Sequence, residues 1–472
     1  MDQLTGYITG VADFLCGYPL FFLLIGGGIY LFVSSRAVSL RRLPAALRQL
    51  REKPDGSTGQ ISSLQALFSV VAATIGMGNI AGVAIALVLG GPGAIFWMWV
   101  SAMVGMATKY HEGVLAVLYR RRDPDGSTRG GTMYIIERAL GPRWRWLAVT
   151  FAVAGMFGTL CIMNANQLTE ATVSVFATPH WVESNGALTA VAIAAGTSNM
   201  VVLRLLIGLT IAFVVSLVVL RGIRRIARVA SVIVPFMVAV YFAAVLYILL
   251  TNAGRVPDAV MSIFNEAFNL RAGIGALAGI AIIGARRASV VNDAGIGTAT
   301  IMHSESRNTD AVREGHVAML GPGIDSGFVC TLTALALLVC GDFTNVEGAK
   351  GLEIAMQAFG QGIPGGQYVL MTVVIFFGMS SMFSYSFYGN RCATYLFGER
   401  GAKWHTLFFL LTIVVFAVVP LEAAVGLCDL FYFLMAVPTM FTVLALSGKV
   451  RKITQLKDEK TAVRPPLPEL SK

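Results

Sequence analysis

Charged side chains are scarce in this sequence. Asp, Glu, Lys and Arg make up 13% of its 472 residues, whereas hydrophobic residues make up 56%. A soluble domain usually carries about 25% charged residues. The deficit excludes an ordinary water-soluble protein and predicts that most of the chain lies in a membrane.

Several short motifs are also missing. The sequence has no G-x-x-x-x-G-K-[ST] phosphate loop, which argues against an ATP-driven pump. Its six cysteines form no C-x-x-C pair and no zinc-type spacing, so we interpret them as buried packing thiols and expect no cofactor. The amino terminus, MDQLTGYITGVADFLCGYP, lacks a basic segment and a cleavage site, which predicts a retained span rather than a signal peptide.

What the sequence does contain is a series of eleven apolar stretches. Each is long enough to cross about 30 Å of hydrocarbon as a helix. The pattern therefore predicts an all-α polytopic membrane protein with about 11 transmembrane helices. The approximate spans are 13–34, 66–90, 92–118, 147–175, 203–220, 229–251, 263–284, 316–340, 366–389, 404–422 and 427–447.

The basic residues behind the net charge of +10 fall mainly on one side of the predicted membrane. If the amino terminus lies outside, the inside intervals hold 31 of the 36 Lys and Arg residues, as the positive-inside rule requires. The basic excess is thus a topology signal for an inner-membrane protein with a cytoplasmic carboxyl terminus, not a nucleic-acid footprint. The inside intervals are 35–63, 119–146, 221–228, 285–315, 390–403 and 448–472.

Glycines interrupt two of the spans at about mid-depth. One interruption lies between Thr74 and Asn79, and the other contains Gly273, Gly275 and Gly279. Glycines in membrane helices can simply allow close packing. Their occurrence in matching positions of two halves, with Asn79 in one of them, favours broken helices around a midplane binding site, as in secondary transporters.

The two halves define the expected organisation. Residues 64–252 and 253–448 form five-helix repeats, and the second must be inverted because five is odd. Residues 1–35 form an extra first helix. Residues 36–63 form a cytoplasmic amphipathic segment, with leucines at helical spacing at 40, 43, 47 and 50, and residues 449–472 form a disordered tail.

One long block carries a family resemblance. The segment ATIGMGNIAGVAIALVLGGPGAIFWMWVSAMVGMATKYHEGVLAVLYR resembles the signature of the alanine or glycine:cation symporter family. The resemblance implies a leucine-transporter-like five-plus-five inverted repeat after an extra helix. It also implies sodium-coupled symport of a small neutral amino acid into the cell. Further similar segments are RGIRRIARVASVIVPFM, NDAGIGTATIMH, REGHVAMLGPGIDSGF and SYSFYGNRCATYLFG.

A zwitterionic amino-acid substrate carries a carboxylate and an ammonium group. Each of these charges needs a partner in a medium of low dielectric constant. The N–H groups of Met77, Gly78 and Asn79 open the outer half-helix, where a carboxylate is favoured. We expect carbonyls near Ala276 and Leu277 to accept from the ammonium group.

The resemblance adds further site residues. It places Met77, Asn164 and Tyr385 in the pocket, where the family usually has threonine, glutamine and tryptophan. It also implies a sodium site made of the Ala72 and Ile75 carbonyls and the hydroxyls of Ser380 and Ser381. Hydroxyls in membrane helices can instead bond to the preceding turn.

Other polar residues leave alternatives open. Lys109 and Glu112 are spaced for a structural ion pair. Asp293 and Asp325 could each serve a gate or a proton, or cap a helix. Proton coupling is therefore an alternative to sodium. A channel would repeat its pore-lining element around an axis, and a membrane-embedded enzyme would cluster His, Asp or Glu at one depth; neither pattern is present.

Overall fold

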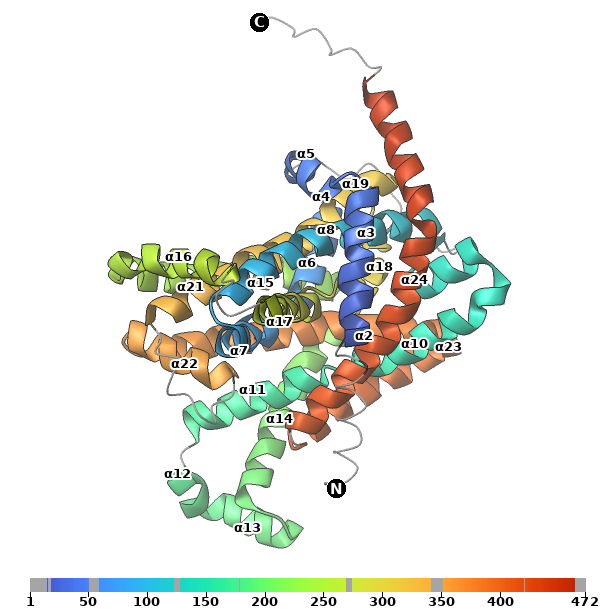
Figure 1. The fold of residues 1–472 in the computed structure, drawn as a ribbon. Coiled ribbons are helices and arrows are strands. Elements are labelled where there is room, and N and C mark those ends of the chain that lie inside the picture. The colour runs from blue at the N-terminus through green and yellow to red at the C-terminus, as the bar shows by residue number, and fades with distance from the viewer. Residues whose placement is uncertain are drawn as a thin grey trace, which may run out of the picture.

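The computed structural model describes residues 15, 18–50, 59–122, 128–177, 179–268, 274–340, 351–419 and 421–462, which are almost entirely helical (Figure 1). Six of the described helices are long and apolar enough to cross a membrane. A seventh span consists of two helices bent by 58° at a short break, Ser63–Thr74 and Gly78–Gly90. The six are Pro142–Phe176, Asn199–Val219, Ile223–Thr251, Ala311–Cys340, Gly366–Phe416 and Gly426–Lys457.

The amino-terminal part forms one apolar helix followed by two short ones. The helix consists of α2 (Tyr18–Phe21), the π-helical turn η1 (Phe22–Gly26) and α3 (Gly27–Ser34). The short helices are α4 (Val38–Arg41) and α5 (Leu43–Gln49). Leu40 and Leu47 are about half exposed, as expected for an amphipathic segment at a membrane surface.

The first half of the core begins with the bent span. Its elements are α6 (Ser63–Thr74), η2 (Gly78–Gly82), α7 (Val83–Gly90), α8 (Gly93–Tyr119), the hairpin β1 (Arg121–Arg122) and β2 (Thr128–Arg129), α9 (Thr132–Ile135), η3 (Ile136–Leu140), η4 (Pro142–Trp144), α10 (Arg145–Gly158), α11 (Ile162–Phe176), α12 (Pro179–Ser184), α13 (Gly186–Ala195), α14 (Asn199–Val219) and α15 (Ile223–Thr251). The predicted span 147–175 is thus two helices, which meet at Cys161 in the left-handed region.

The second half contains a second interrupted helix pair. Its elements are η5 (Ala253–Arg255), α16 (Val256–Ala267), α17 (Ile274–Asn292), α18 (Thr298–His303), α19 (Ala311–Ala318), α20 (Leu320–Pro322), η7 (Gly323–Val329), α21 (Cys330–Cys340), α22 (Gly351–Gly362), α23 (Gly366–Phe416) and α24 (Leu421–Ala462). A non-helical Gly398 kinks α23 and divides it into two helical segments, so the predicted spans 366–389 and 404–422 lie on either side of it.

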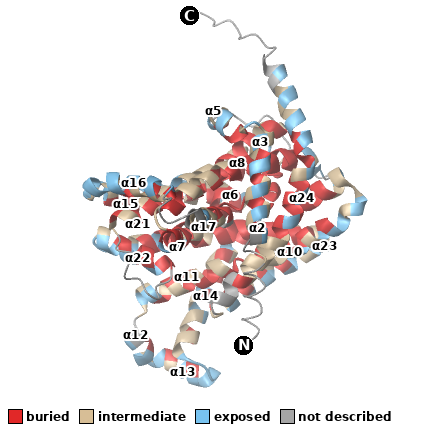
Figure 2. Ribbon diagram, in the orientation of Figure 1, coloured by how far each residue is buried: buried red, intermediate tan, exposed pale blue. Residues whose placement is uncertain are grey.

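The packing separates an interior from an apolar outer surface. Figure 2 shows buried residues concentrated toward the centre of the molecule, for example on α6 and α8. On α14, by contrast, Leu206, Leu209 and Phe213 are 50%, 53% and 64% exposed. Exposed side chains of this kind suit a lipid-facing surface, where no water has to be excluded. In Figure 1, α12 and α13 project from one side of the molecule and the end of α24 from the other.

Two expectations from the sequence were wrong. The span 263–284 is not one helix, because α16 ends at Ala267 and α17 begins at Ile274. The helix α17 also extends into the predicted inside interval 285–315, since Arg286 and Arg287 lie within it. The tail from 449 is not disordered throughout, because α24 continues to Ala462; residues 463–472 lie outside the described part of the chain.

Candidate functional site

The first helix break is held open by Asn79. After α6 ends, Ile75 adopts an extended conformation, with ψ of 96°. The Asn79 side-chain oxygen accepts from the Gly76 N–H at 3.0 Å, and its amide nitrogen donates to Asp325 on η7. Both Asn79 and Asp325 are fully buried. The side chain of Asn79, whose backbone N–H was predicted to contact substrate, therefore fixes the shape of the break and ties it to the second half.

The predicted sodium ligands come together between α6 and α23. The hydroxyls of Ser380 and Ser381 lie 3.2 and 3.1 Å from the Ala72 carbonyl oxygen. Each also lies 3.0 Å from the Phe377 carbonyl oxygen. Ile75, at the end of α6, has an extended conformation, so its carbonyl does not point along the helix axis. Hard oxygens of this kind suit a small cation. The bonds from both hydroxyls to the Phe377 carbonyl are the back-bonds to the preceding turn that serines in membrane helices also form.

A small cavity of about 80 Å³ lies beside these oxygens; we call it the central cavity. Of the residues predicted to bind substrate, Met77, Gly78, Asn164 and Tyr385 line this cavity, and Asn79 does not. The full lining comprises Ala73, Thr74, Gly76, Met77, Gly78, Gly158, Cys161, Ile162, Met163, Asn164, Val291, Asp293, Ser381, Tyr385, Cys428, Asp429 and Tyr432.

Two tyrosine hydroxyls and Asp293 form a hydrogen-bonded chain in the wall of this cavity. The Tyr385 hydroxyl donates to Asp293 at 2.7 Å, and the Tyr432 hydroxyl donates to Tyr385 at 2.7 Å. Asp293 is fully buried and lies in the left-handed region, with φ of +52°. Asp293 thus faces the binding region rather than capping a solvent-exposed helix end.

The second helix break lies at residues 293–297, not near Ala276 and Leu277. The helix α17 runs without interruption from Ile274 to Asn292, so the carbonyls near Ala276 and Leu277 are not released by a break there. The side chains of these two residues lie outside the described part of the chain. The left-handed region is instead occupied by Asp293, Gly295 and Gly297.

Lys109 and Glu112 belong to this second break. Glu112 accepts from the Gly295 N–H at 2.8 Å. Both side chains are fully buried, and the Lys109 ammonium has no hydrogen-bond partner among the described residues. The expectation of a simple ion pair at a helix end therefore misses the main contact, which fixes the unwound segment.

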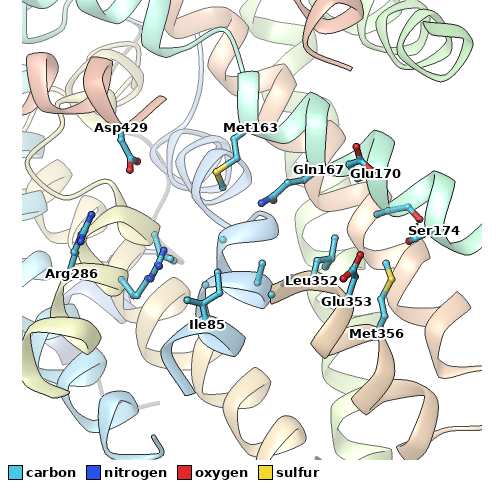
Figure 3. Close-up of a pocket in the computed structure, with 17 residues that line it drawn as sticks. Ile85, Met163, Gln167, Glu170, Ser174, Arg286, Leu352, Glu353, Met356 and Asp429 are labelled. Atoms are coloured by element: carbon cyan, nitrogen blue, oxygen red, sulfur yellow. Dashed lines mark hydrogen bonds between the residues drawn. The ribbon is translucent and has the colours of Figure 1, made fainter. Parts of the chain in front are cut away.

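A larger cavity of about 410 Å³ opens from the central one; we call it the vestibule. The two share Gly78, Met163, Val291 and Asp429. Figure 3 shows Arg286 and Asp429 at one side of the vestibule and Glu170 and Glu353 at the other. Its full lining comprises Gly78, Ala81, Gly82, Ile85, Met163, Gln167, Glu170, Ala171, Ser174, Arg286, Arg287, Val291, Gly351, Leu352, Glu353, Met356 and Asp429.

The opposite end of the core is closed by a polar network. Arg391 pairs with Glu305 at 2.6 Å, and His303 lies 2.6 Å from Glu314. Arg120 donates to the backbone carbonyl of Asn308 at 2.8 Å, and Ile61 forms a bridge with Ser306. Burial raises the pKa of Glu305, and the neighbouring Arg391 opposes that rise. Among the described residues, these contacts tie the segments at that end of the core together.

Sequence reasoning missed several residues of this region. Phe377 precedes Ser380 by one helical turn, so its carbonyl could have been anticipated. Asp429 and Tyr432 are three residues apart in an otherwise apolar stretch of α24, GLCDLFYF, which places them on one helix face.

Comparison with known proteins identifies the family. The model of the sodium:alanine symporter family matches residues 1–464. The chain belongs to this family. It is 37% identical to the sodium/alanine symporter AgcS of Methanococcus maripaludis over 459 residues, covering 96% of this chain and 97% of that protein. It is also 37% identical to an uncharacterized transporter of Haemophilus influenzae over 462 residues, covering 96% and 95%.

A solved structure supports the architecture of this symporter-family protein. The crystal structure of MhsT in complex with L-phenylalanine is similar with a TM-score of 0.57 at 13% identity, covering 85% of this chain and 99% of that one. The similarity shows a shared transporter fold. The chain is therefore a multi-pass membrane protein of a transporter family, not an enzyme.

The central cavity also contains the three positions at which the sequence resemblance predicts residues unusual for the family. Met77, Asn164 and Tyr385 all line it. Met77 is fully buried, and Tyr385 is bonded to Asp293. These three residues thus lie in the wall of one small space rather than in three separate regions.

Proposed function

We propose that this protein is a sodium-coupled symporter that carries a small neutral amino acid of the alanine and glycine class into the cell. The observation that carries the proposal is the position of Ser381. Its hydroxyl lies 3.1 Å from the Ala72 carbonyl and also lines the central cavity. An ion bound at these oxygens and a substrate in the cavity would thus share one wall.

The volume of the central cavity supports a small substrate. At about 80 Å³ it leaves room for little more than a few heavy atoms. The N–H groups of Met77 and Gly78 begin the outer half-helix and would receive the substrate carboxylate. Asp293 lines the same cavity and would neutralise the ammonium group, a role that the sequence assigned to the Ala276 and Leu277 carbonyls.

Sodium would bind to the Ala72, Ile75 and Phe377 carbonyls and the hydroxyls of Ser380 and Ser381. Both hydroxyls lie within hydrogen-bond distance of the Ala72 carbonyl. An ion between α6 and α23 would replace these bonds and hold the first break in the shape that binds substrate. Such differential affinity for one conformation is what couples the two solutes.

Proton coupling is the second candidate. One oxygen of Asp325 and one of Glu112 are buried with no hydrogen-bond partner among the described residues. A proton would remove the cost of leaving such a group charged and unpaired. The same geometry therefore accommodates a proton if the serine oxygens do not bind sodium.

Uptake by the purified protein in liposomes tests the proposal. We expect alanine, glycine or serine to accumulate when sodium is high outside, and not when potassium replaces it at equal pH. Accumulation driven by a pH gradient without sodium would overturn sodium coupling in favour of protons. Uptake that equilibrates without any gradient dependence would overturn symport altogether.

For orientation, we propose an amino terminus outside and a carboxyl terminus in the cytoplasm, in a bacterial-type inner membrane. The positive-inside pattern supports it, even without Arg286 and Arg287. In this orientation the vestibule faces outward and the closed polar network faces the cytoplasm.

A further inference from the structure

A third cavity, of about 350 Å³, lies between the core and the end of the extra first helix, which here is called the added helix (α2, η1 and α3). It is enclosed by the α3–α4 linker, α8 and the final part of α24, which pack against one another. Arg36, Arg41 and Arg451 line it, against a single acidic side chain, Glu459. The lining thus has two more positive than negative charges, which suits an anionic ligand.

Uncharged polar groups complete this lining. Ser34, Ser35 and Thr454 contribute hydroxyls. Tyr110 and His111 come from α8: the Tyr110 hydroxyl bonds to Thr454 at 2.7 Å, and His111 bonds to the Ala107 carbonyl at 2.7 Å. Hydroxyl groups and guanidinium forks are the partners that phosphate oxygens use in proteins.

The linker that carries Arg36 has an uncommon backbone. Arg36 and Ala37 both lie in the left-handed region, each with φ of +55°. Two successive non-glycine residues in this region are costly and persist only where the surroundings determine them. The chain therefore accepts strain where it turns from α3 into α4 beside the cavity.

The surface next to the cavity is apolar and exposed. On α3, Ile29, Tyr30 and Val33 are 48%, 55% and 67% exposed, and they lie within about one turn of Ser34. Leu40 on α4 is 51% exposed. A charged recess directly above an apolar helix face matches the two parts of a phospholipid.

We propose that this cavity binds the phosphate headgroup of an anionic phospholipid, whose acyl chains run along the exposed face of α3. The lipid would join the added helix and the end of α24 to α8 through one shared anion. This proposal does not depend on sodium coupling, and the proposed orientation decides only which leaflet supplies the lipid.

Native mass spectrometry of the purified full chain tests the binding. Phosphatidylglycerol is the probe, with phosphatidylcholine and inorganic phosphate as comparisons. Arg36→Gln, Arg41→Gln and Arg451→Gln combined should weaken phosphatidylglycerol binding roughly a hundredfold, since each basic residue near an anionic lipid contributes about a fivefold gain. The matched control combines Arg48→Gln, Arg221→Gln and Lys452→Gln, which remove the same charge from exposed positions outside the cavity.

Two outcomes would overturn the proposal. If the control triple variant loses as much phosphatidylglycerol as the cavity variant, the attraction is diffuse. If inorganic phosphate binds equally well and displaces the lipid, the ligand is a soluble anion. Should the triple variant fail to fold, Arg451→Gln alone leaves the strained linker intact and should still weaken lipid binding about fivefold.

Discussion

At the scale of single residues, one face of α23 brings the proposed ion and substrate sites together. Ser381 and Tyr385 are four residues apart, one turn of the helix, and both line the central cavity. Ser381 reaches α6, whereas Tyr385 reaches the second break through Asp293. A single helix face thus contacts both interrupted segments.

Replacing Ser380 and Ser381 by alanine should impair sodium use. The double variant loses two hard oxygens, and contacts to a charged group each contribute about 1.5–3 kcal/mol. We expect the sodium concentration for half-maximal uptake to rise at least about tenfold. Ser386→Ala is the matched control, because this buried serine bonds only to its own helix at Phe383. Equal sodium dependence in the double variant and wild type would disprove this ion site.

Replacing Asn79 by alanine should loosen the first break. The change leaves the Gly76 N–H and Asp325 without their partner in a buried region, at a cost of about 1–3 kcal/mol for each group. We expect roughly tenfold weaker substrate binding together with a lower melting temperature in detergent. Wild-type affinity would mean that the break keeps its shape without this side chain.

The wall of the central cavity should control substrate ranking. Met77→Thr, Asn164→Gln and Tyr385→Trp restore the usual family residues, and one methylene group in a pocket discriminates by about 1–3 kcal/mol. The combined variant should favour alanine and glycine over serine more strongly than the wild type does. Competition uptake with the three amino acids measures this ranking. An unchanged order would show that these positions do not select the substrate.

At the scale of elements, the two interrupted helix pairs differ in how they are broken. The first break uses an extended residue and the Asn79 side chain. The second uses three residues with positive φ, held by Glu112 through Gly295. Only the second break therefore has positions, Gly295 and Gly297, whose positive φ favours glycine.

Gly297→Ala should destabilise the protein strongly. Gly297 has φ of +94°, and an added methyl group would lie 2.5 Å from the Thr439 hydroxyl. A left-handed non-glycine residue costs about 1–2 kcal/mol before any clash. Gly279→Ala is the control, since its methyl group meets nothing within 4 Å and alanine is favoured in a helix by about 1 kcal/mol. Thermal unfolding should show a lower midpoint only for Gly297→Ala; equal midpoints would contradict this reading of the break.

These two glycines explain what the sequence could and could not reveal. The first break was predictable, because Gly76, Gly78 and Asn79 interrupt an apolar run at mid-depth. The second break was predicted at the wrong place, because the sequence does not distinguish a helical glycine such as Gly279 from a left-handed one such as Gly297. The Ser380 and Ser381 pair was found only through family resemblance. The spacing of Asp429 and Tyr432 indicates a shared helix face, but which neighbour that face contacts depends on helix packing that no local pattern encodes.

At the scale of the whole molecule, the two ends of the core are unlike. The vestibule reaches the central cavity from one side, while Arg120, Arg391 and their partners close the other. In the proposed orientation the vestibule lies toward the outside and the polar network toward the cytoplasm, as the two ends of an alternating-access transporter would.

Cysteine labelling tests that orientation. Ser184→Cys on α12 and Lys452→Cys on α24 place exposed thiols on opposite sides of the molecule. In intact cells an impermeant maleimide should label the first and not the second, with the wild-type chain as background. Reversed labelling would mean that the topology is inverted.

One helix, α24, contacts all three cavities. Asp429 lies in the vestibule, Tyr432 in the central cavity, and Arg451 in the cavity beside the added helix. Lys457, near its end, is bonded to Asp310. Pro438 lies between these groups and removes one helical hydrogen bond there. The helix therefore connects the junction of the two inner cavities to the far end of the protein, and Pro438 is the point between them at which its two parts can bend. A substitution at Pro438 would thus alter how the two ends of the transporter are joined.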